Sequence, residues 1–393
     1  MEQNALSEPA ILILDDRPRM QPLESLSVRL FPRDDDTVLR DKWLGMEAIS
    51  EHTFFTSWHW ISCWLGTVQA EVLQCEARMG DELVGLGLFV ETLEIRGLIP
   101  LRRLWLHKTG RRAQDRIGIE WNDLLIKRGM ESRARKGVIG HLINRPRVDE
   151  VVFGLTGDGH DAGVAGPGIV ASIGRSDPVP WVDLGRVAAQ GGYDLALSSK
   201  NRNNVRRSQR KAEAMGKLEV RSAATVDEAL RFFREAGPYH IERFKDGKPD
   251  RRSGYLNPAY VAFHEKLIGA VFGRGLVDLV KITAGEAVLA YMYYFVYGKT
   301  VYAYQSAVNF ASHGNASDGK MSPGLLANYL CIRKFADQGM EKFDFLAGDY
   351  YYKQALATDS GWMRFYKYSK PSLKMSAVEK LLAFKRRLFG TGV

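Results

Sequence analysis

The amino-acid sequence predicts an α/β protein made of two similar domains in tandem. The first observation is length, because 393 residues are too many for one ordinary hydrophobic core. The second is order: in each half a hairpin with a glycine-containing turn leads to a third strand, a polar loop, a helix and a final strand. The third is spacing, since residues 148–154 parallel residues 340–346, roughly 190 to 200 positions later.

The first half supplies its copy of this order after a polar, aperiodic tail at residues 1–25, which we expect to be flexible. Apolar runs predict strands, and apolar residues spaced three or four apart predict helices. In chain order we expect a strand at Leu26–Phe31, a helix at Thr37–Ile49, an aromatic core segment at Phe54–Trp64, strands at Val72–Met79, Leu83–Glu91 and Arg103–His107, a helix at Glu131–Ile143 and a strand at Val148–Leu155. Residues 156–180 are rich in Gly, Asp and Pro and are expected to form loops that connect the domains.

The second half begins with a basic helix near residue 200 and then repeats the order. The expected elements are strands at Leu218–Ser222, Leu276–Ile282, Ala287–Val296, Thr300–Ala307 and Glu341–Leu346, and helices at Val226–Phe244, Asn257–Phe272 and residues 322–338. The predicted domains are therefore residues 26–180 and 181–372, with a basic C-terminal helix at 373–393.

Composition restricts the class of partner. A formal charge of +9 favours anionic partners: a nucleotide, a phosphorylated carrier, a membrane surface or nucleic acid. No run approaches 18 apolar residues, and the N-terminus lacks the order of a secretory signal, so a cytoplasmic protein is expected. Three widely spaced cysteines fit neither a disulfide framework nor a zinc site, and no metal is expected.

The strongest charge signal is the segment 198–211, which holds six cationic side chains and no acidic one. On a helix, Arg202 and Arg206 fall on one stripe with Arg207 beside them, while Val205, Ser208, Ala212 and Met215 fall on the opposite side. Guanidinium forks match phosphate or carboxylate oxygens, which makes the three arginines candidates for binding an acidic group of a substrate. The alternative is a solvated basic face.

A helix start at Ser322 is the clearest anion-site signal in the second half. Ser322 suits the N-cap, Pro323 suits the first helical position, and Gly324 leaves the backbone N–H groups open to approach. A strand that feeds such a helix end offers backbone amides to an anion, here those of Gly324, Leu325 and Leu326. The alternative is a well-capped structural helix.

Candidate catalytic groups follow the last predicted strand. Asp344 lies between apolar strand residues, and Tyr352 and Lys353 bring a phenol and an ammonium near the strand end, where ligand sites of α/β sheets gather. His240, on a predicted helix, is a further candidate for a general base. The alternative for each of these residues is a purely structural role. The sequence contains no Walker-type loop, GxGxxG motif, Ser-His-Asp order or paired metal-ligand spacing.

Several of these motifs, taken together, resemble those of the CelD/BcsL-type GNAT acyltransferases. Residues 198–207 are similar to the pattern S-x-x-x-R-x-x-x-R-R, residues 322–326 to S-P-G-x-L-L, and residues 344–353 to D-F-x-x-G-D-x-x-Y-K. In the first half, Thr109-Gly110 and residues 119–123 resemble the segment TG…IEYND, with Trp121 in place of the usual Tyr. The resemblance covers about residues 25–372.

This resemblance implies tandem GNAT-like domains, each a twisted mixed sheet flanked by helices, in an arrangement related to the Fem aminoacyl transferases. It implies transfer of an acyl group from acetyl-CoA or another acyl-CoA to an amino sugar, a sugar nucleotide or a lipid-linked precursor in bacterial exopolysaccharide, cellulose or holdfast synthesis. Asp344 or His240 would be the base, Tyr352 and Lys353 donors, the helix end at Ser322 the donor cradle, and Glu120 and Asn122 substrate contacts. The alternatives are an effector that only binds an anionic nucleotide or lipid, and an aminoacyl-tRNA-dependent ligase. A regulatory nucleotide is a further candidate partner, and no DNA is expected.

The C-terminal segment 374–389 has the pattern of an amphipathic helix. Ala377, Val378, Leu381, Leu382, Phe384, Leu388 and Phe389 share one broad face, with Lys380, Arg386 and Arg387 opposite. We expect either docking on the second domain or peripheral contact with an anionic membrane.

Overall fold

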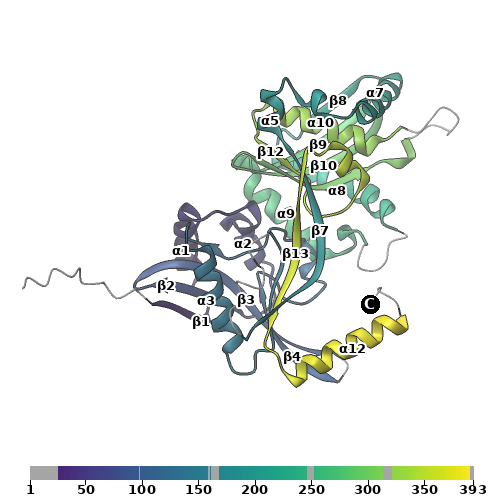
Figure 1. The fold of residues 1–393 in the computed structure, drawn as a ribbon. Coiled ribbons are helices and arrows are strands. Elements are labelled where there is room, and N and C mark those ends of the chain that lie inside the picture. The colour runs from purple at the N-terminus through teal and green to yellow at the C-terminus, as the bar shows by residue number, and fades with distance from the viewer. Residues whose placement is uncertain are drawn as a thin grey trace, which may run out of the picture.

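The structure is a computed structural model that describes residues 25–96, 98–157, 160, 168–245, 252–312 and 321–389 (Figure 1). The predicted tail, apart from Ser25, lies outside the described residues. The described strands form one thirteen-stranded sheet in the order β1-β2-β3-β4-β6-β13-β7-β12-β11-β10-β9-β8, with β5 paired to β3. The strands are β1 (Leu26–Pro32), β2 (Val72–Met79), β3 (Glu82–Arg96), β4 (Ile99–Leu106), β5 (Leu125–Ile126), β6 (Glu150–Thr156), β7 (Val170–Asp183), β8 (Leu218–Ser222), β9 (Val277–Ala284), β10 (Ala287–Tyr297), β11 (Thr300–Val308), β12 (Lys342–Asp344) and β13 (Asp359–Ser369).

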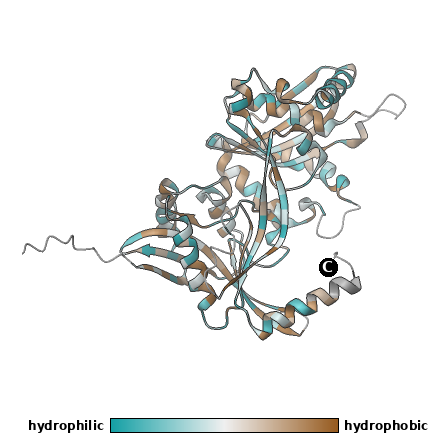
Figure 2. Cartoon of the chain, viewed as in Figure 1, coloured by the Kyte–Doolittle hydropathy of each residue, from teal (hydrophilic) through white to brown (hydrophobic). Residues whose placement is uncertain are grey.

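Helices pack against this sheet, and the buried apolar residues lie mainly on strands to either side of its middle, such as β3 and β10, and on the helices against them (Figure 2). The α-helices are α1 (Asp36–Ile49), α2 (Trp58–Leu65), α3 (Glu131–Asn144), α5 (Leu184–Ala189), α6 (Tyr193–Ala196), α7 (Ser199–Ala214), α8 (Val226–Arg243), α9 (Pro258–Val271), α10 (Pro323–Asp337), α11 (Tyr351–Leu356) and α12 (Leu373–Phe389).

The sheet repeats one arrangement twice. In the first half β1, β2, β3 and β4 are antiparallel neighbours and β4 pairs with β6 in parallel. In the second half β8, β9, β10 and β11 are antiparallel neighbours and β11 pairs with β12 in parallel. The α/β fold with two similar halves is thereby confirmed. β6 and β12, which hold the segments that parallel each other in the sequence, occupy equivalent places.

Two long strands join the halves, and the sequence pattern predicted neither. β7 pairs with β12 of the second half, and β13 pairs with β6 of the first half as well as with β7 (Figure 1). The prediction of connecting loops over residues 156–180 was therefore wrong from Val170 onward. Its Gly and Pro residues suggested a loop, but pairing with β13, nearly 200 residues away in the chain, makes this segment a strand. The predicted boundary between residues 180 and 181 falls inside β7, and the domain limits stay a prediction.

One hydrophobic core crosses from the first half to the second. The aromatic segment predicted to be core is buried, and the rings of Phe54 and Phe295 stack with 4.4 Å between their centroids. Trp60 packs edge-on against Phe263 of α9 and Phe295 of β10. Because aromatic contacts of this kind are large and directional, they fix the aromatic segment of the first half over the sheet of the second.

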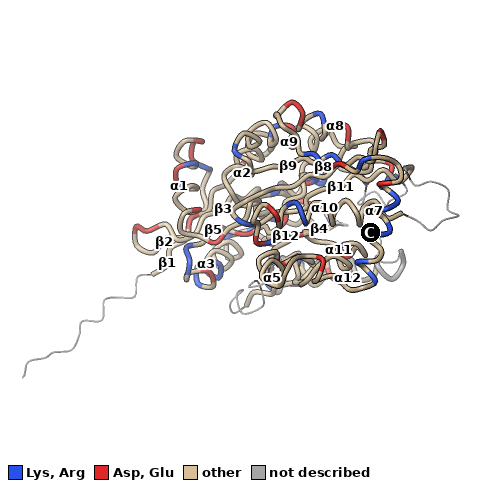
Figure 3. The backbone as a smooth tube through the Cα atoms, turned by 90° about the horizontal axis from the view of Figure 1, so that it is seen from above, with Lys and Arg blue, Asp and Glu red and all other residues tan. Residues whose placement is uncertain are grey.

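The basic helix α7 has the orientation that its periodicity predicts. The Ser198 side chain caps it by accepting a hydrogen bond from the Asn201 amide, and Val205, Ser208 and Ala212 are buried. Met215, predicted on the buried side, is instead exposed because it follows the last helical residue. Lys and Arg positions along α7 are marked in Figure 3.

The C-terminal helix α12 docks on the first half, not on the second as predicted. Met375 and Val378 pack against Leu101 of β4, and the Lys374 ammonium bonds to Asp149 at 2.6 Å. The rest of the helix runs outward from this contact (Figure 1). None of the helices in the described part of the chain is both long enough and apolar enough to span a membrane.

Candidate functional site

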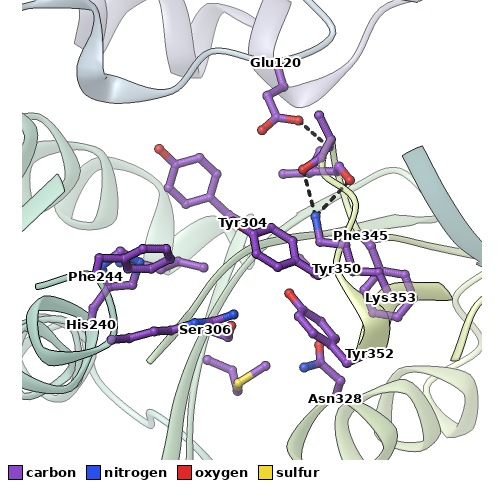
Figure 4. A pocket seen from close by; sticks show the side chains of 16 residues that line it. Glu120, His240, Phe244, Tyr304, Ser306, Asn328, Phe345, Tyr350, Tyr352 and Lys353 are labelled. Atoms are coloured by element: carbon purple, nitrogen blue, oxygen red, sulfur yellow. Dashed lines mark hydrogen bonds between the residues drawn. The ribbon is translucent and has the colours of Figure 1, made fainter. Parts of the chain in front are cut away.

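A cavity lies where β11 and β12 separate. The two strands pair over only three residues of each, Thr300–Tyr302 with Lys342–Asp344. β11 then continues to Val308 beside β10 while the chain after β12 turns away, so the edge of β11 from residue 303 onward faces a chamber of about 160 Å³ (Figure 4). The lining residues are Glu120, His240, Arg243, Phe244, Met292, Ala303, Tyr304, Gln305, Ser306, Asn328, Phe345, Leu346, Ala347, Tyr350, Tyr352 and Lys353.

Glu120 reaches this chamber from the first half of the chain. Its Oε2 accepts a hydrogen bond from the Ala347 amide at 2.7 Å, which leaves Oε1 for another group (Figure 4). Burial raises the pKa of Glu120 to about 7, even though the nearby Lys353 ammonium and the Ala347 amide act in the opposite direction. A carboxyl group whose pKa lies near neutrality is suited to accept and release protons at physiological pH.

Lys353 and Asp344 hold the loop that receives Glu120. The Lys353 Nζ donates to the carbonyl oxygens of Leu346 and Ala347 at 3.1 and 2.8 Å, and burial lowers its pKa to about 8. The Asp344 Oδ1 accepts from the Leu346 amide at 2.8 Å, which stabilises the left-handed backbone of Leu346. Asp344 is fully buried, ion-paired with Lys342 and not part of the chamber lining. The structure therefore places Asp344 as a support of the loop and not as the predicted base.

His240 and Tyr352, both predicted to be catalytic, do line the chamber. The His240 Nδ1 lies 2.8 Å from the Ser253 hydroxyl, and burial together with the Arg243 charge lowers the pKa of His240 to about 4. Burial raises the pKa of Tyr352, whose hydroxyl is directed into the chamber (Figure 4). At neutral pH His240 is therefore a neutral imidazole and Tyr352 a protonated phenol.

Tyr304 of β11 bonds to the loop that carries Glu120. Its hydroxyl donates to the Ile117 carbonyl at 2.5 Å and lies 2.9 Å from the Nε2 of the buried His264. Gly118, next to Ile117, has a positive φ of 72°, and a Cβ there would come within 2.8 Å of the Tyr304 hydroxyl. Glycine is thus needed for this close approach between the two halves.

A wider groove adjoins the chamber. Its volume is about 420 Å³, and it shares Glu120, His240, Phe244, Ala347 and Tyr350 with the chamber. The remaining lining residues are Arg175, Asp177, Arg252, Gly348 and Asp349. Two compartments therefore meet at Glu120, an arrangement that allows two substrates to approach one carboxyl group from different sides.

The predicted donor cradle at the start of α10 lies away from this chamber. Ser322, Gly324, Leu325 and Leu326 are not among the lining residues. The side chains of Leu325 and Leu326 belong to the core, and the Leu326 amide donates to the Ser322 carbonyl at 3.0 Å. The Leu326 amide is therefore not available to a ligand, because the helix itself uses it. One turn further along, Asn328 does line the chamber.

The three arginines predicted to bind an acidic substrate also lie elsewhere. Arg202, Arg206 and Arg207 stand on α7, and none of them lines the chamber or the groove. α7 instead packs on α10, where the Ser208 hydroxyl accepts a hydrogen bond from the Ser322 amide at 3.1 Å. The Arg202 Nη2 donates to the Leu197 carbonyl at 3.0 Å.

Asn122, predicted to contact substrate, fills the corresponding opening of the first half. Its Nδ2 donates to the carbonyls of Leu106 at the end of β4 and Phe153 in β6, at 2.9 and 2.6 Å. Its Oδ1 lies 2.8 Å from the His107 Nδ1, and its backbone amide donates to Leu155. The side chain is fully buried with both polar atoms engaged. The structure therefore gives no support for Asn122 as a substrate contact, and that role stays a prediction.

Comparison with known proteins supports the chemistry of this site. Residues 199–354 match the family model of the acetyltransferase (GNAT) domain. This match supports an N-acyltransferase activity of the GNAT type for the second half of the chain. Of the described lining residues of the chamber, Glu120 alone comes from outside the matched span. No curated protein matches the chain.

Solved structures with a TM-score of 0.50 show the same fold at low sequence identity. A C-terminal domain from Agrobacterium fabrum, named as part of a lysylphosphatidylglycerol synthetase, is 10% identical with a TM-score of 0.50, over 91% of this chain and 98% of that one. A conserved protein of unknown function from Bacteroides thetaiotaomicron is 10% identical with a TM-score of 0.50, over 88% and 100%. FemX is 10% identical with a TM-score of 0.49, over 92% and 100%.

Sequence reasoning missed several residues that line the chamber. Arg243, Tyr304, Ser306 and Asn328 carry no motif, and Glu120 was placed at the substrate only through the resemblance. The available signal was the alternation of polar side chains in residues 119–123. The Glu120 side chain reaches the chamber, and the Asn122 side chain bonds within the first half. The Asp123 carboxylate pairs with Arg135 at 2.6 Å. Among the residues that the structure describes, no cluster of His, Cys, Asp and Glu is arranged to hold a metal ion.

Proposed function

We propose that the protein transfers an acyl group, most simply acetyl from acetyl-CoA, to an amine at the chamber between β11 and β12. The observation that carries this proposal is that the chamber of the matched domain places Glu120 and the Tyr352 hydroxyl around one space. The edge of β11 beyond Tyr302 offers main-chain groups to an extended chain that contains amides, such as the pantetheine arm of coenzyme A. The acceptor would then enter from the groove on the other side of Glu120.

In the proposed reaction Glu120 acts as the general base. Its carboxylate takes a proton from the acceptor nitrogen, which then attacks the thioester carbonyl carbon. A C–N bond forms, the C–S bond breaks, and the departing sulfur receives the phenolic proton of Tyr352. Lys353 acts through the backbone at Leu346 and Ala347, which positions the Glu120 carboxyl group.

The acceptor class rests on the sequence resemblance, which implies an amino sugar, sugar nucleotide or lipid-linked precursor of exopolysaccharide synthesis. The outer groove supports a polar acceptor, because Arg175, Asp177, Arg252 and Asp349 line it. The decisive experiment is to incubate the protein with acetyl-CoA and a panel of UDP-linked amino sugars, measuring free thiol and acetylated product by mass spectrometry. Thiol release without acetylated product from any amine would contradict the proposal.

We further propose peripheral contact with an anionic membrane through α12 and the hairpin of β3 and β4. Leu98 at the hairpin tip is 98% exposed, and Phe384 on α12 is 60% exposed with the cationic Lys380 one turn earlier. Apolar and cationic groups together favour the interface of anionic lipid. Phe384→Ser combined with Lys380→Ser should reduce sedimentation with phosphatidylglycerol vesicles at low salt. Equal sedimentation of variant and parent protein would exclude α12 from membrane contact.

A further inference from the structure

Arg243 occupies a position in the chamber that the proposed reaction does not use. It is the last residue of α8, and its Nη1 donates to the Ser306 hydroxyl on β11 at 3.3 Å. α8 covers one face of the sheet, so this side chain extends from the helix end to the strand whose edge lines the chamber. The negative end of the helix dipole favours a cation at this place.

Aromatic rings surround the guanidinium group. Its carbon lies 5.3 Å from the centroid of Phe244, 5.6 Å from that of Tyr350 and 6.0 Å from that of Phe310. Such contacts stabilise a cation without neutralising its charge, and they restrict the orientation of the planar fork. A fork held in this way is preorganised to bind a ligand with two oxygen atoms.

Among the residues that the structure describes, no carboxylate forms an ion pair with Arg243. Two other arginines of α8 form ion pairs, Arg231 with Glu228 at 2.8 Å and Arg234 with Glu265 at 2.6 Å. Within the described part of the chain, Arg243 contacts the Ser306 and Tyr352 hydroxyls and three aromatic rings, and it has no carboxylate within 4.0 Å. Its field reaches the chamber, since it acts to lower the pKa values of His240, Tyr352 and Lys353.

We propose that Arg243 is an anion-binding residue that holds a phosphate or carboxylate group of a substrate in the chamber. The substrate assignment rests on the proposed acyl transfer, whereas the anion site itself does not. Two sources of the anion are consistent with the geometry: the diphosphate of the acyl-CoA donor, which would pass along β11 beside Ser306, or an acidic group on the acceptor amine. In either case the bidentate fork would bind two oxygen atoms of one group.

The test compares Arg243→Gln and Arg243→Lys with the control Arg234→Gln, which removes a charge from the same helix at an exposed ion pair. Calorimetry with inorganic pyrophosphate should show binding to the parent protein, and Arg243→Gln should weaken it by about tenfold or more. Arg243→Lys should restore only part of the affinity, because an ammonium cannot form the fork. Melting temperatures of all variants check that the fold is retained.

Further arms identify the source of the anion. Weaker binding of acetyl-CoA with unchanged binding of acetyl-pantetheine, which lacks the diphosphate, assigns the anion to the donor. A larger rise in KM for glucosamine 6-phosphate than for glucosamine assigns it to the acceptor. Either result supports the anion site, whereas a folded Arg243→Gln variant that binds pyrophosphate and both donors and turns over as the parent does overturns it. A parent protein that binds pyrophosphate in an Arg243-dependent way but transfers no acyl group contradicts the proposed function alone.

Discussion

Each half of the sheet has an opening where two parallel strands separate. The chain fills this opening in one half and leaves it as a chamber in the other. In each half two parallel strands pair over three residues of each, β4 with β6 and β11 with β12. Beyond this pairing in the first half, the Asn122 amide bonds to the backbone of both strands. Beyond it in the second half lies the chamber. One opening is thus closed by the chain itself, and the other remains accessible to a substrate.

This difference shows that two halves with the same arrangement of strands can have different roles. The segment that closes the first opening also carries Glu120, two residues before Asn122, into the second opening. The closed half therefore positions a carboxyl group that the matched GNAT span does not contain. Its rigidity has a physical source, because the buried bonds of Asn122 and the link between Tyr304 and Ile117 fix both ends of the loop.

The largest effect is expected from removing Glu120, the proposed base, which the closed half supplies. Glu120→Gln keeps the size of the side chain and should lower kcat by about 100- to 10,000-fold, because proton removal from the acceptor amine loses its catalyst. Steady-state kinetics with acetyl-CoA and an accepted amine measure this change. The exposed Glu71→Gln is the matched control, and a Glu120→Gln variant with parental kcat would assign the base to another residue.

The next largest effect is expected from removing Asn122, which closes the opening between β4 and β6. Asn122→Ala should lower the free energy of unfolding by about 3 kcal/mol or more, because buried carbonyl groups and His107 lose their partners. Urea denaturation measures the change, and Asn203→Ala on the exposed face of α7 serves as control. A variant as stable as the parent would show that the bonds of Asn122 do not hold the first opening closed.

Stoichiometry tests the comparison directly. Calorimetric titration with acetyl-CoA should give one donor per chain, since only the second opening holds a chamber in the described residues. Two donors per chain would show that the first opening also binds a donor and is not closed.

The pH dependence sharpens the role of Glu120. The raised pKa of Glu120, about 7, predicts that kcat/KM rises with pH as the carboxylate forms near neutrality and that Glu120→Gln lacks this limb. Stability should change in the opposite sense. The folded protein holds the Glu120 proton more tightly than the unfolded chain, so this contribution is complete below the ordinary glutamate pKa of 4.5 and is lost as pH rises through about 7. Unfolding titrations of the parent and Glu120→Gln between pH 5 and pH 8 measure the difference.

The smallest effect is expected at the link between the halves. Tyr304→Phe removes the hydroxyl that bonds to Ile117 and should lower kcat only a few-fold, consistent with about 1 kcal/mol for one hydrogen bond. KM for the donor should stay unchanged. A large loss of stability together with a large rise in donor KM would mean that Tyr304 organises the chamber itself.

The sequence by itself determined the elements that depend on local pattern. Period and capping predicted α7 with Val205, Ser208 and Ala212 inside, and the order of strands predicted two similar halves. These features follow from neighbours within a few residues or from the repeat, so they can be read along the chain. Motif resemblance also singled out Glu120, Tyr352 and Lys353, which line the chamber, but it did not distinguish Glu120 from Asn122.

Only the tertiary structure decided what depends on contacts between distant segments. β7 became a strand because β13 pairs with it, and Glu120 became a titratable group near neutrality because the loop after β12 buries it. The same dependence made Asp344 a support for Leu346 and turned Asn122 into the closure of the first opening. Burial and desolvation are set by groups more than 200 residues away in the chain, and no local pattern records them.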